Sequence, residues 1–184
     1  MDDPSAVTCE ELSQANEDAR DDMKSNEHGS AIADVGNANA TITHGVYTSP
    51  GGISGVMRGC SRAVVHQYDD SFAKGQSYEE KKEAAKENDG KVASKACGGH
   101  VYKRAFFHPH SSHTEARILD DIFKANPAGG GKLLISIDWP GGPKAGKTPK
   151  SPCDECKDLI CAASECMEIK ICDENDKPKK PKCD

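Results

Sequence analysis

The sequence predicts an α/β domain of roughly 105 residues in which helices cross a sheet, and three observations carry this prediction. Apolar residues between positions 112 and 126 recur at helical spacing, at Ile118, Leu119, Ile122 and Phe123. Residues 133–139 form a nearly continuous apolar run, which is typical of a strand buried on both faces. Two further short runs are joined by Gly98-Gly99, a connection that favours a hairpin.

Residues 1–75 read as an acidic extension rich in Gly, Asn and Ser, in which apolar periodicity is weak. We expect one helix there, capped by Ser5 and ending near Lys24, and a short strand over residues 40–47. Other residues between 29 and 55 are expected to form loops. The folded domain should then span residues 76–184 and end in a polar tail.

Within that domain the first predicted element is a helix over residues 77–88, where Ser77 and Glu80 fit a capping box. The elements that follow are the hairpin of runs 91–97 and 100–107, a helix over 112–126, a strand over 133–139, a loop over 140–151, a helix over 152–165 and a strand over 167–172. Pro152 suits the first helical position.

The order of these elements predicts where the chemistry lies. The second hairpin strand, the helix over 112–126 and the strand over 133–139 are expected to form a right-handed parallel unit. Both strands would then end at one edge of the sheet. The helices that begin near residues 113 and 153 would therefore direct their N-termini into one crevice, where such sheets place ligands.

Composition excludes several classes of protein. With 35% hydrophobic and 5% aromatic residues, the 184-residue chain supports one ordinary core. Its apolar runs are too short to span a membrane, and the acidic start Met1-Asp2-Asp3-Pro4 is unlike a secretory signal. The net charge is −6, divided as −9 over residues 1–90 and +3 over residues 91–184. This excludes a wholly basic nucleic-acid coat protein and leaves room for a local basic site.

The chain has nine cysteines, and six of them follow residue 152. The odd count, the absence of a signal and the Cys153-x-x-Cys156 pair favour reduced thiols and metal binding over a disulfide framework. Cys161, Cys166 and Cys172 occupy helix or strand positions that suit small buried hydrophobic residues.

Two short motifs at the predicted helix starts carry the chemistry. Cys153 and Cys156 are three residues apart at a helix start, where the helix dipole favours thiolates, and His113 supplies a nitrogen from the other helix. One His and two Cys suit Zn²⁺ with an open fourth position, as in a catalytic site. Glu115 lies on the inward face of its helix and could move a proton between water and substrate.

Each motif also has an interpretation without catalysis. Ser112 and Glu115 fit a capping box, which needs no metal. A lone CxxC can be a zinc ligand pair, a redox pair or an accident of sequence. The conjunction of both motifs, each at the head of a helix that follows a strand, favours a combined site.

A second group of residues could contact a substrate near the predicted crevice. His108 and His110 could add metal ligands or line the pocket, or simply belong to a loop. Trp139 could stack on a base while lysines of the following loop hold phosphates, or this loop could be solvated and flexible. The loop lysines are Lys144, Lys147 and Lys150. Lysines of the C-terminal tail alternate with acids and prolines, which favours a solvated end.

His113-x-Glu115 followed by Pro152-Cys153-x-x-Cys156 resembles the H-x-E…P-C-x-x-C signature of the zinc-dependent nucleobase deaminases. The order helix, hairpin, helix, strand, helix, strand is similar to the cytidine-deaminase-like fold, over about residues 77–172. The resemblance implies a three-layer fold: a mixed sheet with an N-terminal hairpin and helices on both faces. The stretch 113–119 also resembles toxin domains of bacterial polymorphic toxin systems.

The resemblance implies that His113, Cys153 and Cys156 hold Zn²⁺ and that Glu115 is the proton carrier. We expect deamination of cytosine to uracil in nucleic acid, most readily in single-stranded DNA. A toxin of this kind would be made in the bacterial cytoplasm without a Sec signal and act in the cytoplasm of a rival cell. It would have a cognate immunity protein in the producing cell, and no membrane partner is expected.

Three alternatives stay open at this point. The same enzyme could act on RNA, adenine or free nucleosides. The chain could be a non-enzymatic zinc-stabilised binding module, in which Cys161, Cys166 or Cys172 closes the fourth coordination position. Toxicity could also reside in the N-terminal extension, with the rest of the chain as a scaffold.

Overall fold

The computed structural model describes residues 6–24, 41–60, 92–96, 100–103 and 114–183. Its elements in chain order are α1 (Cys9–Lys24), β1 (Ile42–Thr48), β2 (Ser54–Cys60), β3 (Val92–Ala96), β4 (His100–Lys103), α4 (Thr114–Ala125), β5 (Lys132–Asp138), the 3-10 helix η4 (Pro143–Ala145), α5 (Asp154–Ala163), β6 (Glu168–Cys172) and β7 (Pro178–Lys179). The α/β class is confirmed. The helix predicted over residues 77–88 lies outside the described residues. None of the described helices combines the length and apolar character needed to span a bilayer.

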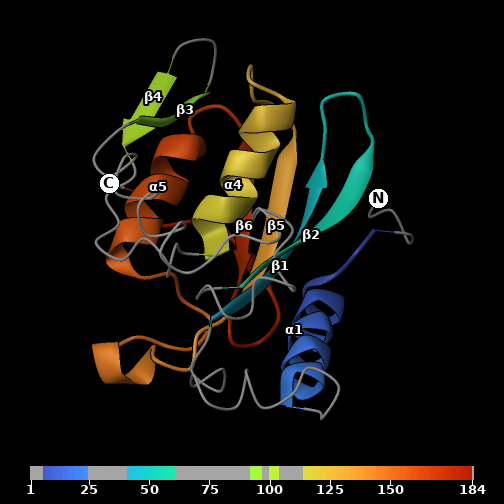
Figure 1. The fold of residues 1–184 in the computed structure, drawn as a ribbon, viewed down its shortest axis with the longest axis vertical. Coiled ribbons are helices and arrows are strands. Elements are labelled where there is room, and N and C mark those ends of the chain that lie inside the picture. Colours follow the sequence, from blue (N-terminus) through green and yellow to red (C-terminus); the bar gives the residue numbers. More distant parts are fainter. Residues whose placement is uncertain (1–5, 25–40, 61–91, 97–99, 104–113, 184) are drawn as a thin grey trace, which may run out of the picture.

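The central feature is a mixed sheet of five strands in the order β2-β1-β5-β6-β7 (Figure 1). Its central strand, β5, pairs antiparallel with β1 and parallel with β6. The edge strands β2 and β7 are antiparallel to their neighbours. The sheet therefore takes strands from both sides of the boundary that the sequence places at residue 75.

The predicted parallel unit requires a correction. The two runs joined by Gly98-Gly99 do form antiparallel strands, β3 and β4, but these make a separate two-stranded sheet. The parallel unit of the main sheet is β5, α5 and β6. Strand β1 takes the place beside β5, and all seven of its residues, Ile42–Thr48, pair with the seven residues of β5.

Helices cover both faces of the main sheet (Figure 1). Leu133, Ile135 and Ile137 of β5 pack with α4 and α5 in the principal core. On the other face, Leu134 and Val46 pack against Leu12 of α1. Alternate residues of β5 thus face two helical layers, which explains why the strand reads as a continuous apolar run.

Three details of the secondary structure differ from the sequence prediction. Helix α1 begins at Cys9 rather than near Ser5, and the Thr8 hydroxyl caps it by accepting a hydrogen bond from the Glu11 N–H at 3.2 Å. Helix α5 begins at Asp154, so Pro152 precedes it. The tail after β6 is not wholly irregular, because β7 pairs with β6.

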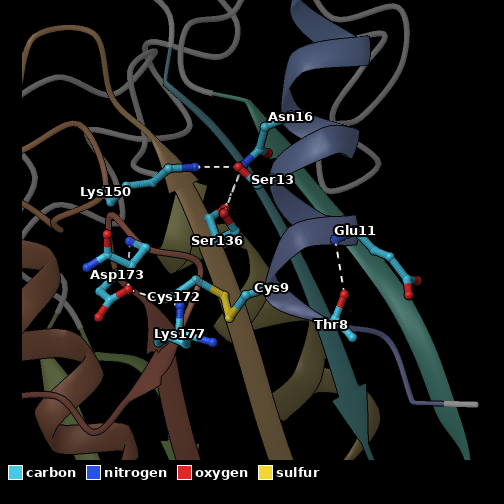
Figure 2. The surroundings of a disulfide bond; sticks show 11 residues. Thr8, Cys9, Glu11, Ser13, Asn16, Ser136, Lys150, Cys172, Asp173 and Lys177 are labelled. Carbon is cyan, nitrogen blue, oxygen red and sulfur yellow. Dashed lines mark hydrogen bonds between the residues drawn. A yellow bond between two sulfur atoms is a disulfide. The ribbon is translucent and has the colours of Figure 1, made fainter. Parts of the chain in front are cut away.

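The expectation of reduced thiols is wrong for the described cysteines outside the Cys153-x-x-Cys156 pair. Cys9 of α1 is bonded to Cys172 of β6, and Cys161 of α5 is bonded to Cys183 (Figure 2 shows the first bond). Cys166 is also disulfide-bonded. The first pair is separated by 163 residues and the second by 22, so local spacing in the sequence carries no sign of either. Cys161, Cys166 and Cys172 are therefore cross-links rather than simple packing residues.

A buried polar network joins α1 to three strands of the sheet. The Arg58 Nε donates to His44 Nε2 at 3.0 Å, so the proton of the neutral ring lies on Nδ1, which donates to Asn16 Oδ1 at 2.8 Å. The Asn16 amide donates in turn to the Ser136 carbonyl at 3.0 Å. Burial, together with the smaller effect of the Arg58 charge, lowers the pKa of His44 to about 4, against a weaker opposing effect of Asp18.

This network predicts a loss of stability in mild acid. The unfolded chain binds a proton at His44 below pH 6.5, whereas the folded chain does so only near pH 4. The free energy of unfolding should therefore fall as the pH drops through this window, by on the order of 3 kcal/mol. Urea unfolding at pH 7 and pH 4.5 measures the change. The His44→Asn variant cannot titrate there, so an equal acid loss in the variant would contradict the assignment.

Candidate active site

The N-termini of α4 and α5 lie at one edge of the main sheet. Ile42 of β1 is paired with both Cys60 of β2 and Asp138 of β5, so the carboxyl ends of β2 and β5 meet there. The start of α4 packs directly on β2, because a Cβ at Gly59 would lie 2.9 Å from the Thr114 carbonyl oxygen. The hydroxyl of Thr114 is also hydrogen-bonded to that of Thr43 in β1. These contacts fix the end of α4 that carries Glu115.

Glu115 and Cys156 meet between the two helix starts. The Cys156 Sγ donates to the Glu115 Oε2 at 3.0 Å. Both side chains are buried, with 4% of Glu115 and 0% of Cys156 exposed. Burial of a carboxylate is costly unless a partner compensates it. The sequence predicts that the acid and the CxxC motif converge, and the structure brings these two residues into contact.

Cys153 lies at the N-cap of α5, one turn from Cys156. Its sulfur accepts a hydrogen bond from the Cys156 N–H at 3.4 Å, as the oxygen of a capping Ser or Asp would. Neither cysteine of the motif is disulfide-bonded. The other cysteines whose side chains the structure describes are all disulfide-bonded. The fold thus leaves out of its disulfides the two sulfurs that the sequence predicts as metal ligands.

The electrostatics of the pair oppose a thiolate in the metal-free protein. Burial raises the pKa of the Cys156 thiol well above its ordinary value, and the hydrogen bond with Cys153 and the negative charge of Glu115 raise it further. Cys156 is therefore protonated at neutral pH, which agrees with its role as a donor to Glu115. A dication at this point would reverse the balance, because a thiol that coordinates a metal loses its proton.

The predicted third ligand, His113, lies outside the described residues, as do His108 and His110. His113 immediately precedes Thr114, the first residue of α4. Ser112, the other half of the proposed capping box, also lies outside them. Across the described parts of the chain, no group of three or more His, Cys, Asp or Glu side chains is arranged to hold a metal ion.

The residues that the sequence predicts as substrate contacts lie in several different environments. Trp139 follows β5 and packs partly buried against the core. Its backbone N–H donates to the Pro149 carbonyl at 2.8 Å. Lys144 is exposed in η4. Lys147 forms an ion pair with Asp154 at 2.9 Å, and this contact lowers the pKa of the Asp154 carboxyl. The lysine is thereby held at the start of α5, beside Cys153.

Lys150 is directed toward α1, where its Nζ donates to the Ser13 hydroxyl at 2.7 Å (Figure 2). The loop over residues 140–151 is therefore tied to α1 and α5 rather than freely solvated. The sequence does not predict the contact of Thr43 with Thr114.

In the comparisons made, the chain matches no protein-family model, no curated protein and no solved structure. The functional argument therefore depends on the site geometry and on the order of the secondary-structure elements.

Proposed function

We propose that the protein is a zinc-dependent hydrolytic deaminase that converts cytosine to uracil in nucleic acid, with single-stranded DNA as the preferred substrate. One observation carries the proposal: the Glu115 carboxylate lies 3.0 Å from the sulfur of Cys156, at the junction of two helix starts. A buried acid beside a free thiol pair is the arrangement that the H-x-E…P-C-x-x-C signature requires.

The residues present fit a zinc site as far as they are described. Cys153 and Cys156 lie one turn apart and are not disulfide-bonded, and thiolates are preferred ligands of Zn²⁺. His113 would complete the protein ligands from the residue before α4. Zn²⁺ bound to these three residues supplies a Lewis acid that lowers the pKa of water toward neutrality.

Glu115 is assigned the proton transfers. It is close enough to the thiol pair to act on a molecule held there, and its burial excludes competing bulk water. In the proposed reaction Glu115 takes a proton from the attacking water and delivers it to the ring nitrogen of cytosine. It then takes a second proton from the new C4 hydroxyl and gives it to the amino group, which departs as ammonia. The bond formed is C4–O, the bond broken is C4–N, and no redox partner is needed.

The order of elements also supports the proposal, although through different segments from those expected. The pair β3–β4 lies between β2 and α4 in the chain. Apart from this pair, helix α1, the hairpin β1–β2, helix α4, strand β5, helix α5 and strand β6 follow the order helix, hairpin, helix, strand, helix, strand. In this arrangement the hairpin belongs to the same sheet as β5 and β6. The helices that carry the two motifs then begin at the end of this sheet where β2 and β5 stop on either side of β1, as a shared site requires.

One version of the binding-module alternative is excluded, namely the version in which a further cysteine provides the fourth metal ligand. Cys161, Cys166 and Cys172 are all disulfide-bonded, so none of them is a thiolate. The interbacterial role and the cognate immunity protein stay predictions from the sequence.

The zinc and the activity can be tested together. We expect the purified chain to hold about one Zn²⁺ and to form uracil in a single-stranded cytosine-containing oligonucleotide. Cys156→Ala should lose both the metal, measured by elemental analysis, and the uracil, measured by glycosylase cleavage. The double variant Cys161→Ala with Cys183→Ala removes a bonded pair and should keep the metal. A protein that binds zinc and forms no uracil in DNA, but does deaminate RNA, would change the substrate assignment to RNA. Equal zinc in the wild type and Cys156→Ala would contradict the site.

A further inference from the structure

A cavity of about 490 Å³ opens beside α5, on the side of the C-terminal tail. Its walls are the loop over residues 147–152, one side of α5, the end of β6 and the tail over residues 179–182. Pro152 and Lys147 line it, and these residues adjoin Cys153 and Asp154 at the start of α5. The cavity is therefore next to the candidate active site and separate from the contact of Glu115 with Cys156.

The charge of this cavity is opposite to that of the chain. Six lysines line it, against the two acids Asp173 and Glu174, in a protein whose net charge is −6. The lysines are Lys147, Lys150, Lys157, Lys179, Lys180 and Lys182. Such a local concentration of positive charge in a concave surface attracts and orients polyanions.

The existing contacts leave much of this positive charge unneutralised. Asp173 already accepts hydrogen bonds from the Asn175 and Lys177 N–H groups, at 2.8 and 2.9 Å, and lies 3.6 Å from the Lys179 Nζ. Within the described residues, no ion pair engages Lys157, Lys180 or Lys182. These three ammonium groups are available to an anionic ligand.

A strand pairing and a disulfide bond hold the backbone of the tail in place. Strand β7 pairs with β6, and the disulfide between Cys161 and Cys183 fixes the end of the tail to α5. The lysines at 180 and 182 lie between these two constraints. The cost of ordering the backbone that carries them is therefore met in the folded protein, before any ligand binds.

We infer that this groove binds the phosphodiester backbone of a single-stranded nucleic acid. A concave strip of lysines matches the positively charged groove with which proteins follow the backbone of a single strand. Its position at the start of α5 would lead the strand to the thiol pair. In that role the inference rests on the proposed function, but binding can be measured without catalysis.

The experiment uses fluorescein-labelled oligothymidylate and oligouridylate, which contain no cytosine and so cannot react. Fluorescence anisotropy of the full chain at several salt concentrations gives the affinity and its salt dependence. The test variant is Lys180→Ala with Lys182→Ala, inside the groove. The control is Lys132→Ala with Lys177→Ala, which removes the same charge from lysines outside it.

The groove variant should bind about tenfold more weakly than the wild type, and its salt slope should fall by about 1.4, since each lost phosphate contact contributes about 0.7. The control should stay within about twofold of the wild type. Equal losses in both variants would overturn the inference. So would lysine-dependent binding to phosphatidylserine vesicles without binding to either oligonucleotide.

The two proposals fail separately. Binding that depends on the groove lysines, in a protein that forms no uracil, would refute the deaminase and leave the groove standing. Uracil formation that is unaffected by the groove variant at limiting substrate would refute the groove and leave the deaminase standing.

Discussion

Glu115→Gln is expected to abolish uracil formation while leaving the fold and the bound zinc in place. Gln has the shape of Glu but cannot carry a proton between water, ring nitrogen and ammonia, and general acid–base groups contribute roughly 10² to 10⁴ in rate. Its side-chain oxygen can still accept from the Cys156 thiol in the metal-free protein, so the packing around this contact should survive. Glycosylase cleavage of a cytosine-containing oligonucleotide measures the rate.

The matched control for this variant is Glu168→Gln. Glu168 begins β6, is exposed, and lies 3.8 and 3.5 Å from Lys132 and Lys170. It pairs with Lys132 at the start of β5, whereas the candidate site is at the other end of that strand. Its replacement should change the rate by less than about twofold, because exposed ion pairs contribute little. Equal activity of wild type and Glu115→Gln would remove Glu115 from the mechanism. A Glu115→Gln protein that loses zinc would show that the carboxylate holds the site together rather than transferring protons.

The candidate site could be placed from the sequence because its signals are local. Helix periodicity and breakers give the start of α4 and α5 to within about two residues, and the two motifs sit at those starts. Contact between Glu115 and Cys156 then follows from strands that end at a common edge of the sheet. The prediction reached this contact through the wrong strands, because β1, with β2 beyond it, takes the position beside β5 that the prediction gave to a later hairpin.

The remaining errors come from interactions between distant segments. Gly55 and Gly59 interrupt the apolar pattern of β2, so nothing local marks residues 54–60 as a strand. Pairing with β1 overrides this weak propensity. The disulfides were missed for a related reason: an odd cysteine count indicates an unpaired thiol, but it gives no information about which residues the fold brings together.

Removal of the disulfide between Cys9 and Cys172 is expected to be the most destabilising change outside the site. The bond closes a loop of 163 residues, and the chain-entropy model assigns about 5 kcal/mol to a loop of this length. It also joins α1 to β6 in the smaller core, where both sulfurs are buried beside Leu12. The variant Cys9→Ala with Cys172→Ala leaves no unpaired thiol at either position, and urea unfolding under oxidising conditions measures its stability.

The bond between Cys161 and Cys183 provides the internal comparison. Its sequence separation of 22 residues corresponds to about 3 kcal/mol in the same model, so the two double-alanine variants should differ by about 2 kcal/mol. Because Cys183 and the tail are exposed, loss of the shorter link should free the tail without disturbing the main core. Equal destabilisation of the two variants would mean that α1 does not depend on its covalent link to β6. In that case the buried network of Asn16, His44 and Ser136 would be sufficient to hold the helix on the sheet.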